Sequence, residues 1–262
     1  MSETSIHAVR YGSHLTTRGD FYLSWSSYGE PDSALDMAYY FWVIRDGAGG
    51  PVTVVDTGFS EAEAARRGRS MDYPPARALH DLGIDPAAVP RVVITHLHYD
   101  HAGNLALFPN AEFVLARREF DFWTGDPIAR RPLFAQHTDP AAIALLCRAN
   151  TDGRVRLFDD TLDLDGNIRL LRLGGHTPGQ TVVSVQGGEQ PVLLASDAVH
   201  FHEELAKDRP PRVLSNLGEY YCGFDTLVDL STRGYRVVPG HDPAISAQYP
   251  AVGAAAPIVR LA

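Results

Sequence analysis

The chain has 262 residues, of which 45% are hydrophobic and 21% charged, and its formal net charge is −9. This apolar content supports a substantial core and excludes disorder, collagen and coiled coil. The negative charge argues against a nucleic-acid or anionic-membrane surface, because both partners attract a cationic one. We expect a small molecule or another protein as partner, and a homo-oligomer is compatible with the composition.

The first 60 residues predict antiparallel strands, at residues 6–11, 20–24, 39–44 and 52–55. Beyond Pro74 the pattern changes to helices alternating with strands. The helices are predicted at 75–82, 140–148 and 224–232, and the strands at 91–95, 113–116, 168–173, 181–185, 192–195 and 235–238. No Gly-rich phosphate loop follows a strand, so we expect a single domain, residues 1–262, of layered sheets covered by helices.

Targeting features point to a cytoplasmic location. The first 12 residues contain no apolar core of the length that a signal peptide requires. The longest uncharged stretch, residues 243–259, is too interrupted by proline to cross a bilayer as a helix. The two cysteines, Cys147 and Cys222, cannot build a disulfide framework.

The densest chemical motif is THLHYDH, residues 95–101, which directly follows the apolar run 92–94. A strand that ends by delivering His96 and His98 points both imidazoles to one side, and the next loop can return Asp100 and His101 to the same point. This spacing predicts a metal cage rather than a His-rich surface turn.

Three more candidates, His176, Asp197 and His241, follow separate predicted strands. Each alone is a weak indication, because histidine beside glycine or proline is common in turns. Together with the first motif they make five imidazoles and two carboxylates, more than one tetrahedral zinc needs. Two metal ions that share a bridging carboxylate explain the set better.

On these residues the sequence resembles the metallo-β-lactamase superfamily, whose H-x-H-x-D-H motif matches residues 96–101. The turn Asp56-Thr57-Gly58 matches another hallmark, and the resemblance runs from about residue 6 to residue 242. Within the superfamily the chain is most similar to the N-acyl-homoserine lactonase group, through residues 95–103, 175–179 and 240–242. The resemblance implies an α/β fold, an αββα sandwich of two mixed β-sheets flanked by helices.

The resemblance also implies which residue holds which of two divalent metal ions, with zinc as the default for these donors. The implied ligands are His96, His98 and His176 for the first metal, Asp100, His101 and His241 for the second, and Asp197 as the bridge. Asp56 has no ligand role in this set. We expect it to fix the strand end or to orient a metal-bound histidine.

Other branches of the superfamily fit less well. Diiron oxidoreductases carry a glutamate where His98 stands, and broad-spectrum β-lactamases have a cysteine or serine near one of these positions. Glyoxalase II-type thioesterases add a helical region after the last histidine, whereas 21 residues follow His241 here. RNA-processing members would add a nucleic-acid-binding arm, and neither a long insertion nor a basic excess is present.

One position departs from the best-known lactonases, which place a tyrosine three residues after the bridging aspartate; here His200 stands there. An imidazole can donate one hydrogen bond, so either His200 takes over the contact with the substrate carbonyl, or the substrate differs, or His200 is a loop residue. We expect Asp100 and His200 to be catalytic, Asp100 by passing a proton to the leaving oxygen. We expect His200, Trp25 and Tyr28 to bind substrate.

The remaining histidines have no ligand spacing, so we expect His7, His14, His80 and His137 to be structural or exposed. The pair Arg66-Arg67 is expected to be a solvated face.

The predicted function is a dinuclear metal-dependent hydrolase, a lactonase of the quorum-quenching type that opens a lactone ring by attack of a metal-bridging hydroxide. Two alternatives stay open. One is another ester, thioester or amide hydrolase of the same superfamily, and the other is a metal-binding module without turnover.

Overall fold

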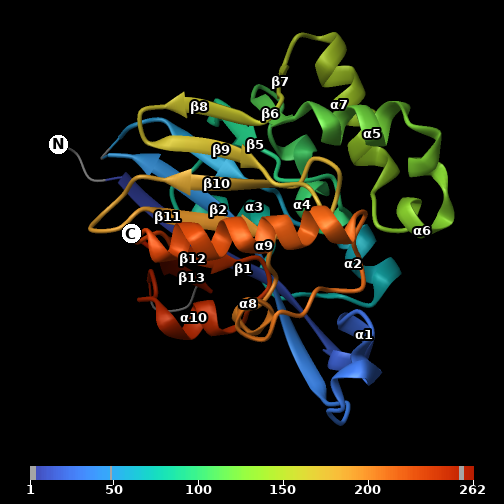
Figure 1. Ribbon diagram of the computed structural model, residues 1–262. Coiled ribbons are helices and arrows are strands. Elements are labelled where there is room, and N and C mark those ends of the chain that lie inside the picture. The colour runs from blue at the N-terminus through green and yellow to red at the C-terminus, as the bar shows by residue number, and fades with distance from the viewer. Residues whose placement is uncertain (1–3, 48, 254–256) are drawn as a thin grey trace.

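The structure is a computed structural model that describes residues 4–47, 49–253 and 257–262. Its strands form two facing sheets with helices on the outer sides (Figure 1). In spatial order, the first sheet contains β13 (Ile258–Arg260), β1 (Thr4–Thr17), β2 (Ala34–Asp46), β3 (Val52–Val55), β5 (Arg91–Val93), β6 (Glu112–Ala116) and β7 (Val155–Phe158), with β4 (Ser70–Met71) paired to β1. The second contains β12 (Arg236–Pro239), β11 (Val192–Ser196), β10 (Thr181–Val185), β9 (Ile168–Arg172) and β8 (Thr161–Asp165).

Both sheets combine parallel and antiparallel neighbours. In the first sheet β1, β2 and β3 pair antiparallel, and β3, β5, β6 and β7 pair parallel. In the second sheet β11 and β12 are parallel, and the other pairs are antiparallel. The predicted αββα sandwich of two mixed sheets is therefore confirmed.

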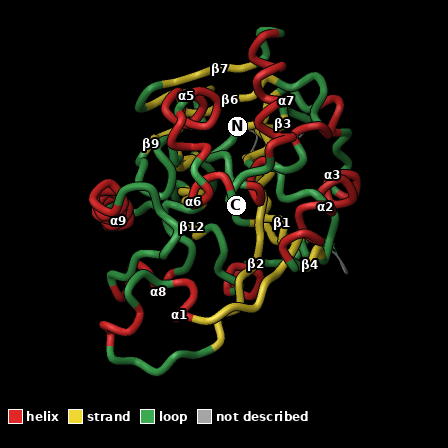
Figure 2. Tube along the Cα trace, turned by 90° about the vertical axis from the view of Figure 1, so that its right-hand side faces the viewer, coloured by secondary structure: helices red, strands yellow, loops and turns green. Residues whose placement is uncertain are grey.

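The α-helices cover the outer faces and form the connections. They are α1 (Arg18–Phe21), α2 (Glu61–Arg67), α3 (Pro75–Asp81), α4 (Tyr99–Ala102), α5 (Arg117–Gly125), α6 (Pro132–Ala135), α7 (Pro140–Thr151), α8 (His202–Lys207), α9 (Leu217–Thr232) and α10 (Ala244–Gln248). Four 3₁₀ turns complete the chain: η1 (Trp25–Tyr28), η2 (Pro86–Ala88), η3 (Leu105–Leu107) and η4 (Pro127–Arg130). Figure 2 shows α9 on one side of the strands and α2 and α3 on the other. Among the described residues, no helix is long and apolar enough to span a membrane.

The alternation of side chains in β2 explains why a nearly continuous apolar run forms this strand. Tyr40 and Trp42 enter the core between the two sheets, together with residues of β10 and β11. Phe41 and Val43 point the other way and join the core beneath the outer helices. Successive side chains of a strand point to opposite faces, so a strand covered on both faces has no polar side.

One predicted strand is wrong. Residues 20–24 do not form a strand, because the chain turns into α1 at Arg18. The side chain of Thr17 caps this turn by accepting a hydrogen bond from the backbone N–H of Asp20. The strand before it, β1, instead continues to Thr17 and pairs with β2 along its whole length.

Candidate metal centre

The predicted ligands follow the carboxyl ends of strands that point to one edge of the sandwich. His96 and His98 come after β5, His176 after β9, Asp197 after β11 and His241 after β12. Loops at the carboxyl ends of such strands are the usual location of ligand sites in open α/β sheets. The first sheet and the second sheet therefore both contribute to one site.

The structure brings all seven predicted ligands together in two buried groups. Within each group, one ligand atom per residue lies within 4.8 Å of every other. The groups are His96, His98, His176 and Asp197, and Asp100, His101 and His241.

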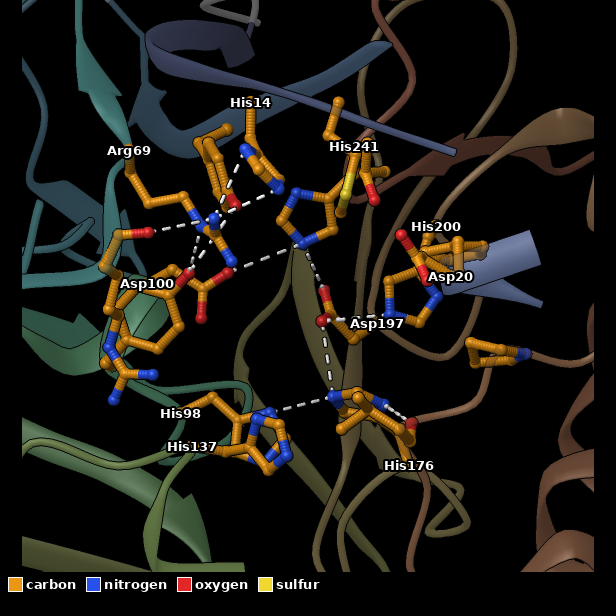
Figure 3. A pocket seen from close by; sticks show the side chains of 18 of the residues that line it. His14, Asp20, Arg69, His98, Asp100, His137, His176, Asp197, His200 and His241 are labelled. Carbon is orange, nitrogen blue, oxygen red and sulfur yellow. Dashed lines mark hydrogen bonds and ion pairs between the residues drawn. The ribbon is translucent and has the colours of Figure 1, made fainter. Parts of the chain in front are cut away.

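Asp197 faces both groups, with one carboxylate oxygen toward each. Its Oδ2 atom lies 3.3 Å from His176 Nε2 and 3.7 Å from His96 Nε2. Its Oδ1 atom lies 3.1 Å from His241 Nε2 and 3.2 Å from His101 Nε2. This is the arrangement that a carboxylate shared by two cations requires (Figure 3).

Three buried atoms at the centre of the site face other ligand atoms without forming a hydrogen bond. His96 Nε2, His101 Nε2 and Asp197 Oδ1 accept or donate no hydrogen bond among the described residues. A buried polar atom left in that state costs about 1–3 kcal/mol. Imidazole nitrogens and carboxylate oxygens are donors that zinc and similar divalent metals accept. The residues present therefore fit two metal ions.

The outward-facing nitrogens of the ligand histidines are already held by the protein. His176 Nδ1 lies 2.9 Å from the carbonyl of Val213, and His241 Nδ1 lies 2.9 Å from the carbonyl of Ala38. Such contacts fix the tautomer in which Nδ1 carries the proton and Nε2 is available to a metal.

His101 is oriented by Asp56. The Nδ1 atom of His101 lies 2.8 Å from Asp56 Oδ2, and the other oxygen of this carboxylate accepts from the backbone N–H of Thr95 at 2.8 Å. The contact expected between Asp56 and a ligand histidine is thus present. Asp56 adopts a left-handed conformation with φ of 62°, as does Ser196, next to Asp197, with φ of 48°. Strained residues of this kind cluster at functional sites.

Burial keeps three ligand imidazoles neutral. It lowers the pKa of His96 and of His98 well below the ordinary value, and lowers the pKa of His176 to about 3. Neutral imidazole is the form that binds metal. Burial alone would raise the pKa of Asp197, but the adjacent imidazoles, first His101, hold the pKa of this carboxyl well below its usual range.

His200 lies between two carboxylates. Its Nε2 atom is 3.1 Å from Asp197 Oδ2, and its Nδ1 atom is 3.2 Å from Glu204 Oε1. Tyr220 OH donates to the other oxygen of Glu204 at 2.9 Å. Burial lowers the pKa of His200, but the two carboxylates outweigh it and raise the pKa to about 10. The ring lines the cavity above the ligands and also fixes the Asp197 carboxylate.

Glu119, in the first turn of α5, ties two ligand-bearing loops together. One oxygen accepts from the backbone N–H of Leu97 at 2.8 Å and from Trp123 Nε1 at 2.7 Å, and the other accepts from the N–H of Gly179 at 2.8 Å. Any side chain at Gly179 would collide with Glu119. Sequence analysis missed this residue, because a glutamate after two arginines at a helix start has the pattern of a solvent-exposed turn.

A cavity of about 440 Å³ lies over the two ligand groups. His14, Arg67 and His137, which were expected to be structural or solvated, line it together with Arg66. Arg66 is exposed, as expected. His14 reaches it because β1 extends beyond its predicted end, and His137 because the chain between α6 and α7 passes His98, with ring centroids 5.4 Å apart. No short-range spacing connects these residues to the ligand motif.

A second hollow of about 250 Å³ shares His98, His137 and His176 with this cavity. We call it the apolar hollow. Its other lining residues are largely apolar, among them Trp123, Leu133, Phe134 and Leu214, and they also include Arg212.

The predicted substrate-binding residues Trp25 and Tyr28 lie in another aromatic cluster. Trp25 stacks on Tyr22, with ring centroids 5.6 Å apart, and Arg209 covers both Trp25 and Tyr28. Two residues of this region line the cavity, Asp20 and Phe21, and the ring of Phe21 lies 5.2 Å from that of His200.

Comparison with known proteins gives a consistent result. The model of the metallo-beta-lactamase superfamily matches residues 36–241. The N-acyl homoserine lactonase AttM of Azorhizobium caulinodans is 32% identical over 166 residues, which are 62% of this chain and 61% of that protein. The match thus spans about three fifths of the relative's length.

Solved structures share the fold. A quorum-quenching N-acyl homoserine lactone lactonase superposes with a TM-score of 0.73 at 17% identity, over 93% of this chain and 94% of the other. AidC, a dizinc quorum-quenching lactonase, superposes with a TM-score of 0.73 at 18% identity, over 93% of this chain and 88% of its own. Both likenesses extend over nearly the whole sandwich.

Proposed function

The chain belongs to the metallo-beta-lactamase superfamily, and from this premise we propose that it is a dinuclear metal-dependent hydrolase that opens a lactone ring. The observation that carries the proposal is the position of Asp197, whose two oxygens face two groups of imidazole and carboxylate donors beneath a cavity large enough for a small molecule. The names of the relatives support a lactone of the N-acyl-homoserine type as the substrate class.

We propose zinc as the native metal, held by the seven ligands in the two groups described. When bound, such ions lower the pKa of water to about 7 and polarise a carbonyl group, which is the chemistry that ester hydrolysis at neutral pH needs.

The protein's own residues supply orientation and proton transfer. Asp100, kept in place by the hydrogen bond from Tyr11 OH to its backbone carbonyl at 2.6 Å, takes up the proton that the attacking water loses and passes it to the leaving oxygen. His200 acts at the carbonyl end of the substrate, from a ring fixed between Asp197 and Glu204. Trp25 and Tyr28 act indirectly, by supporting the segment that carries Phe21.

A substrate panel tests this proposal. Protein stripped of metal and then reconstituted with zinc is assayed on acyl-homoserine lactones, aromatic lactones, aryl esters, thioesters and β-lactams. We expect lactones to give the highest kcat/KM and the metal-free protein to be inactive. Preference for another ester class would identify a different hydrolase, and no turnover of any compound by the metal-loaded protein would identify a binding module.

Metal content of protein purified without added salts tests the choice of zinc, and we expect two zinc ions per chain. A cytoplasmic location, a homo-oligomer and a single domain over residues 1–262 stay predictions.

A further inference from the structure

One side of the cavity is formed by three arginines, Arg66, Arg67 and Arg69, which we call the arginine wall. Within the described chain, a single carboxylate forms ion pairs with it. Glu63 Oε2 lies 2.6 Å from Arg66 Nη2 and 2.7 Å from Arg67 Nε. Two guanidinium groups thus share one acid, and Arg69 has no ion pair among the described residues.

Arg69 is held by neutral groups. Its Nε atom donates to Tyr99 OH at 3.2 Å, and its Nη1 atom donates to the carbonyl of Arg67 at 3.0 Å and lies 3.0 Å from His14 Nε2. Burial and the adjacent Arg69 lower the pKa of His14, so its ring is neutral and can accept this bond. The Nη2 group of Arg69 contacts no acceptor in the described part of the chain, although the residue is half-buried and lines the cavity.

The charge of this wall contrasts with that of the whole chain, whose net charge is −9. The other acids that line the cavity are Asp100 and Asp197, which belong to the ligand groups, and Asp20, which is exposed. A guanidinium with free donors at a partly desolvated wall attracts an anion strongly, because the cavity has a lower dielectric than water.

The arginine wall runs along the cavity rather than closing one end of it. Arg67 Nη2 donates to the carbonyl of Thr138 at 3.3 Å, next to His137, whereas Arg69 contacts His14. Figure 3 shows Arg69 and His14 on the side of Asp100, whereas His98 and His137 border the other end. The apolar hollow opens beside His98 and His137. A molecule spanning the site therefore meets the donors of Arg69 at one end and, at the other, a largely apolar hollow that Arg212 also lines.

We propose, on the basis of the lactonase function proposed above, that the arginine wall binds a carboxylate that the substrate carries at a distance from its scissile ester. Arg69 is then a specificity-determining residue. The preferred substrates of the enzyme are then lactones with a free acid group rather than lactones with wholly apolar substituents.

A matched pair of substrates tests the proposal. The zinc-loaded protein is assayed with N-glutaryl-homoserine lactone and with the analogue whose terminal carboxylate is replaced by a carboxamide, and succinyl and adipoyl homologues vary the spacer. We expect kcat/KM to favour the carboxylate at least about tenfold at the best spacer length, mainly through KM, since a hydrogen bond to a charged acceptor is stronger than one to a neutral amide. The preference should shrink as salt is added.

Variants assign the preference to Arg69. Arg69→Gln should raise KM for the carboxylate about tenfold and leave the carboxamide unchanged, and Arg69→Lys should restore part of the preference. Arg117→Gln, at an arginine paired with Asp159 and outside the cavity lining, is the matched control. The absence of a carboxylate preference at every spacer length would overturn the proposal. So would an equal loss on both substrates in Arg69→Gln, because that result assigns Arg69 to the support of Tyr99.

A binding measurement separates this proposal from the lactonase function. Titration calorimetry with glutarate needs no turnover, so it remains informative if no lactone is hydrolysed. We expect the wild-type protein to bind glutarate about tenfold more tightly than Arg69→Gln does, and equal affinities would contradict the proposal.

Discussion

The ligand groups and the cavity walls of this site are built on different principles. Each ligand histidine is buried, and those at positions 101, 176 and 241 have an outer nitrogen fixed by a specific acceptor. The walls consist of partly exposed arginines on one side and apolar side chains on the other, some of them strongly exposed, such as Leu133 at 71%. The positions of the metal ligands are therefore fixed by several contacts each. The choice of substrate depends on a few wall side chains that are not held in this way.

The largest effect on activity is expected from a change to Asp197, which bridges the two ligand groups. Asp197→Asn keeps the shape but removes the negative charge that both groups share. We expect kcat/KM to fall by well over the ~100-fold that is typical when a residue hydrogen-bonded to a metal ligand is removed. We also expect the loss of at least one metal ion. Kinetics and elemental analysis measure the effect. Full activity with two bound ions would refute the bridging role.

A smaller effect on metal binding and stability is expected from Glu119, which holds the two ligand-bearing loops together. Glu119→Gln exchanges one acceptor oxygen for an amide N–H, which cannot accept from Leu97 or Gly179. We expect about 10- to 100-fold weaker metal binding and about 1–3 kcal/mol less free energy of unfolding.

Competition with a chelator and denaturant titration give the two quantities for Glu119→Gln. Asp121→Asn, at an exposed residue of the same helix, is the control. If Glu119→Gln and Asp121→Asn behave alike, Glu119 has no positioning role.

A substitution in the apolar hollow should change activity less than the substitutions above, and only for some substrates. Phe134→Ala enlarges it without touching a ligand. We expect KM to rise several-fold for lactones with long, wholly apolar acyl chains, which cannot pair with the arginine wall, and to change little for short ones, because each buried methylene contributes about 0.8 kcal/mol. Kinetics on a chain-length series measure this, with Ile128→Ala, at an exposed residue of η4, as the control. A uniform loss at all chain lengths would place the acyl chain elsewhere.

The smallest effect lies far from both regions, at His7 in β1. Burial, and then Arg260 and Arg45, lower the pKa of His7 below its ordinary value of 6.5. The unfolded chain therefore takes up the proton first, so this residue's contribution to stability is present above pH 6.5 and is lost as the pH falls below it.

Unfolding titrations of wild type and His7→Gln between pH 7 and pH 5 measure this contribution. The variant should lose less stability on acidification, by at most about 1.4 kcal/mol per pH unit. His80→Gln, at a side chain that is 87% exposed, should behave like wild type. Parallel pH profiles for wild type and His7→Gln would contradict the assignment.

Local patterns in the sequence predicted layered sheets and a metal cage, and the resemblance to the superfamily supplied the αββα arrangement and the division of the ligands between two metals. Apolar runs bounded by turns define the strands, and the ligand motif directly follows one of them. The helix α1 escaped prediction because its formation depends on one capping contact of Thr17.

The walls could not be predicted, since Arg69 and His14 meet only through the pairing of β1 with β4 and the return of the chain after α2. Glu119 likewise becomes recognisable only when the amides of Leu97 and Gly179 are seen to converge on it. Tertiary contacts of this kind produce no pattern of spacing that can be recognised in the sequence.

Each ligand group takes residues from loops of both sheets, with Asp100 and His101 from the first sheet and His241 from the second. Metal ions held there would act as a cross-link between the two halves of the sandwich, in the way that a disulfide joins distant segments. Bound metal would then increase the free energy of unfolding as well as supply the chemistry. Metal depletion in the cell would accordingly limit the lifetime of the protein as well as its turnover.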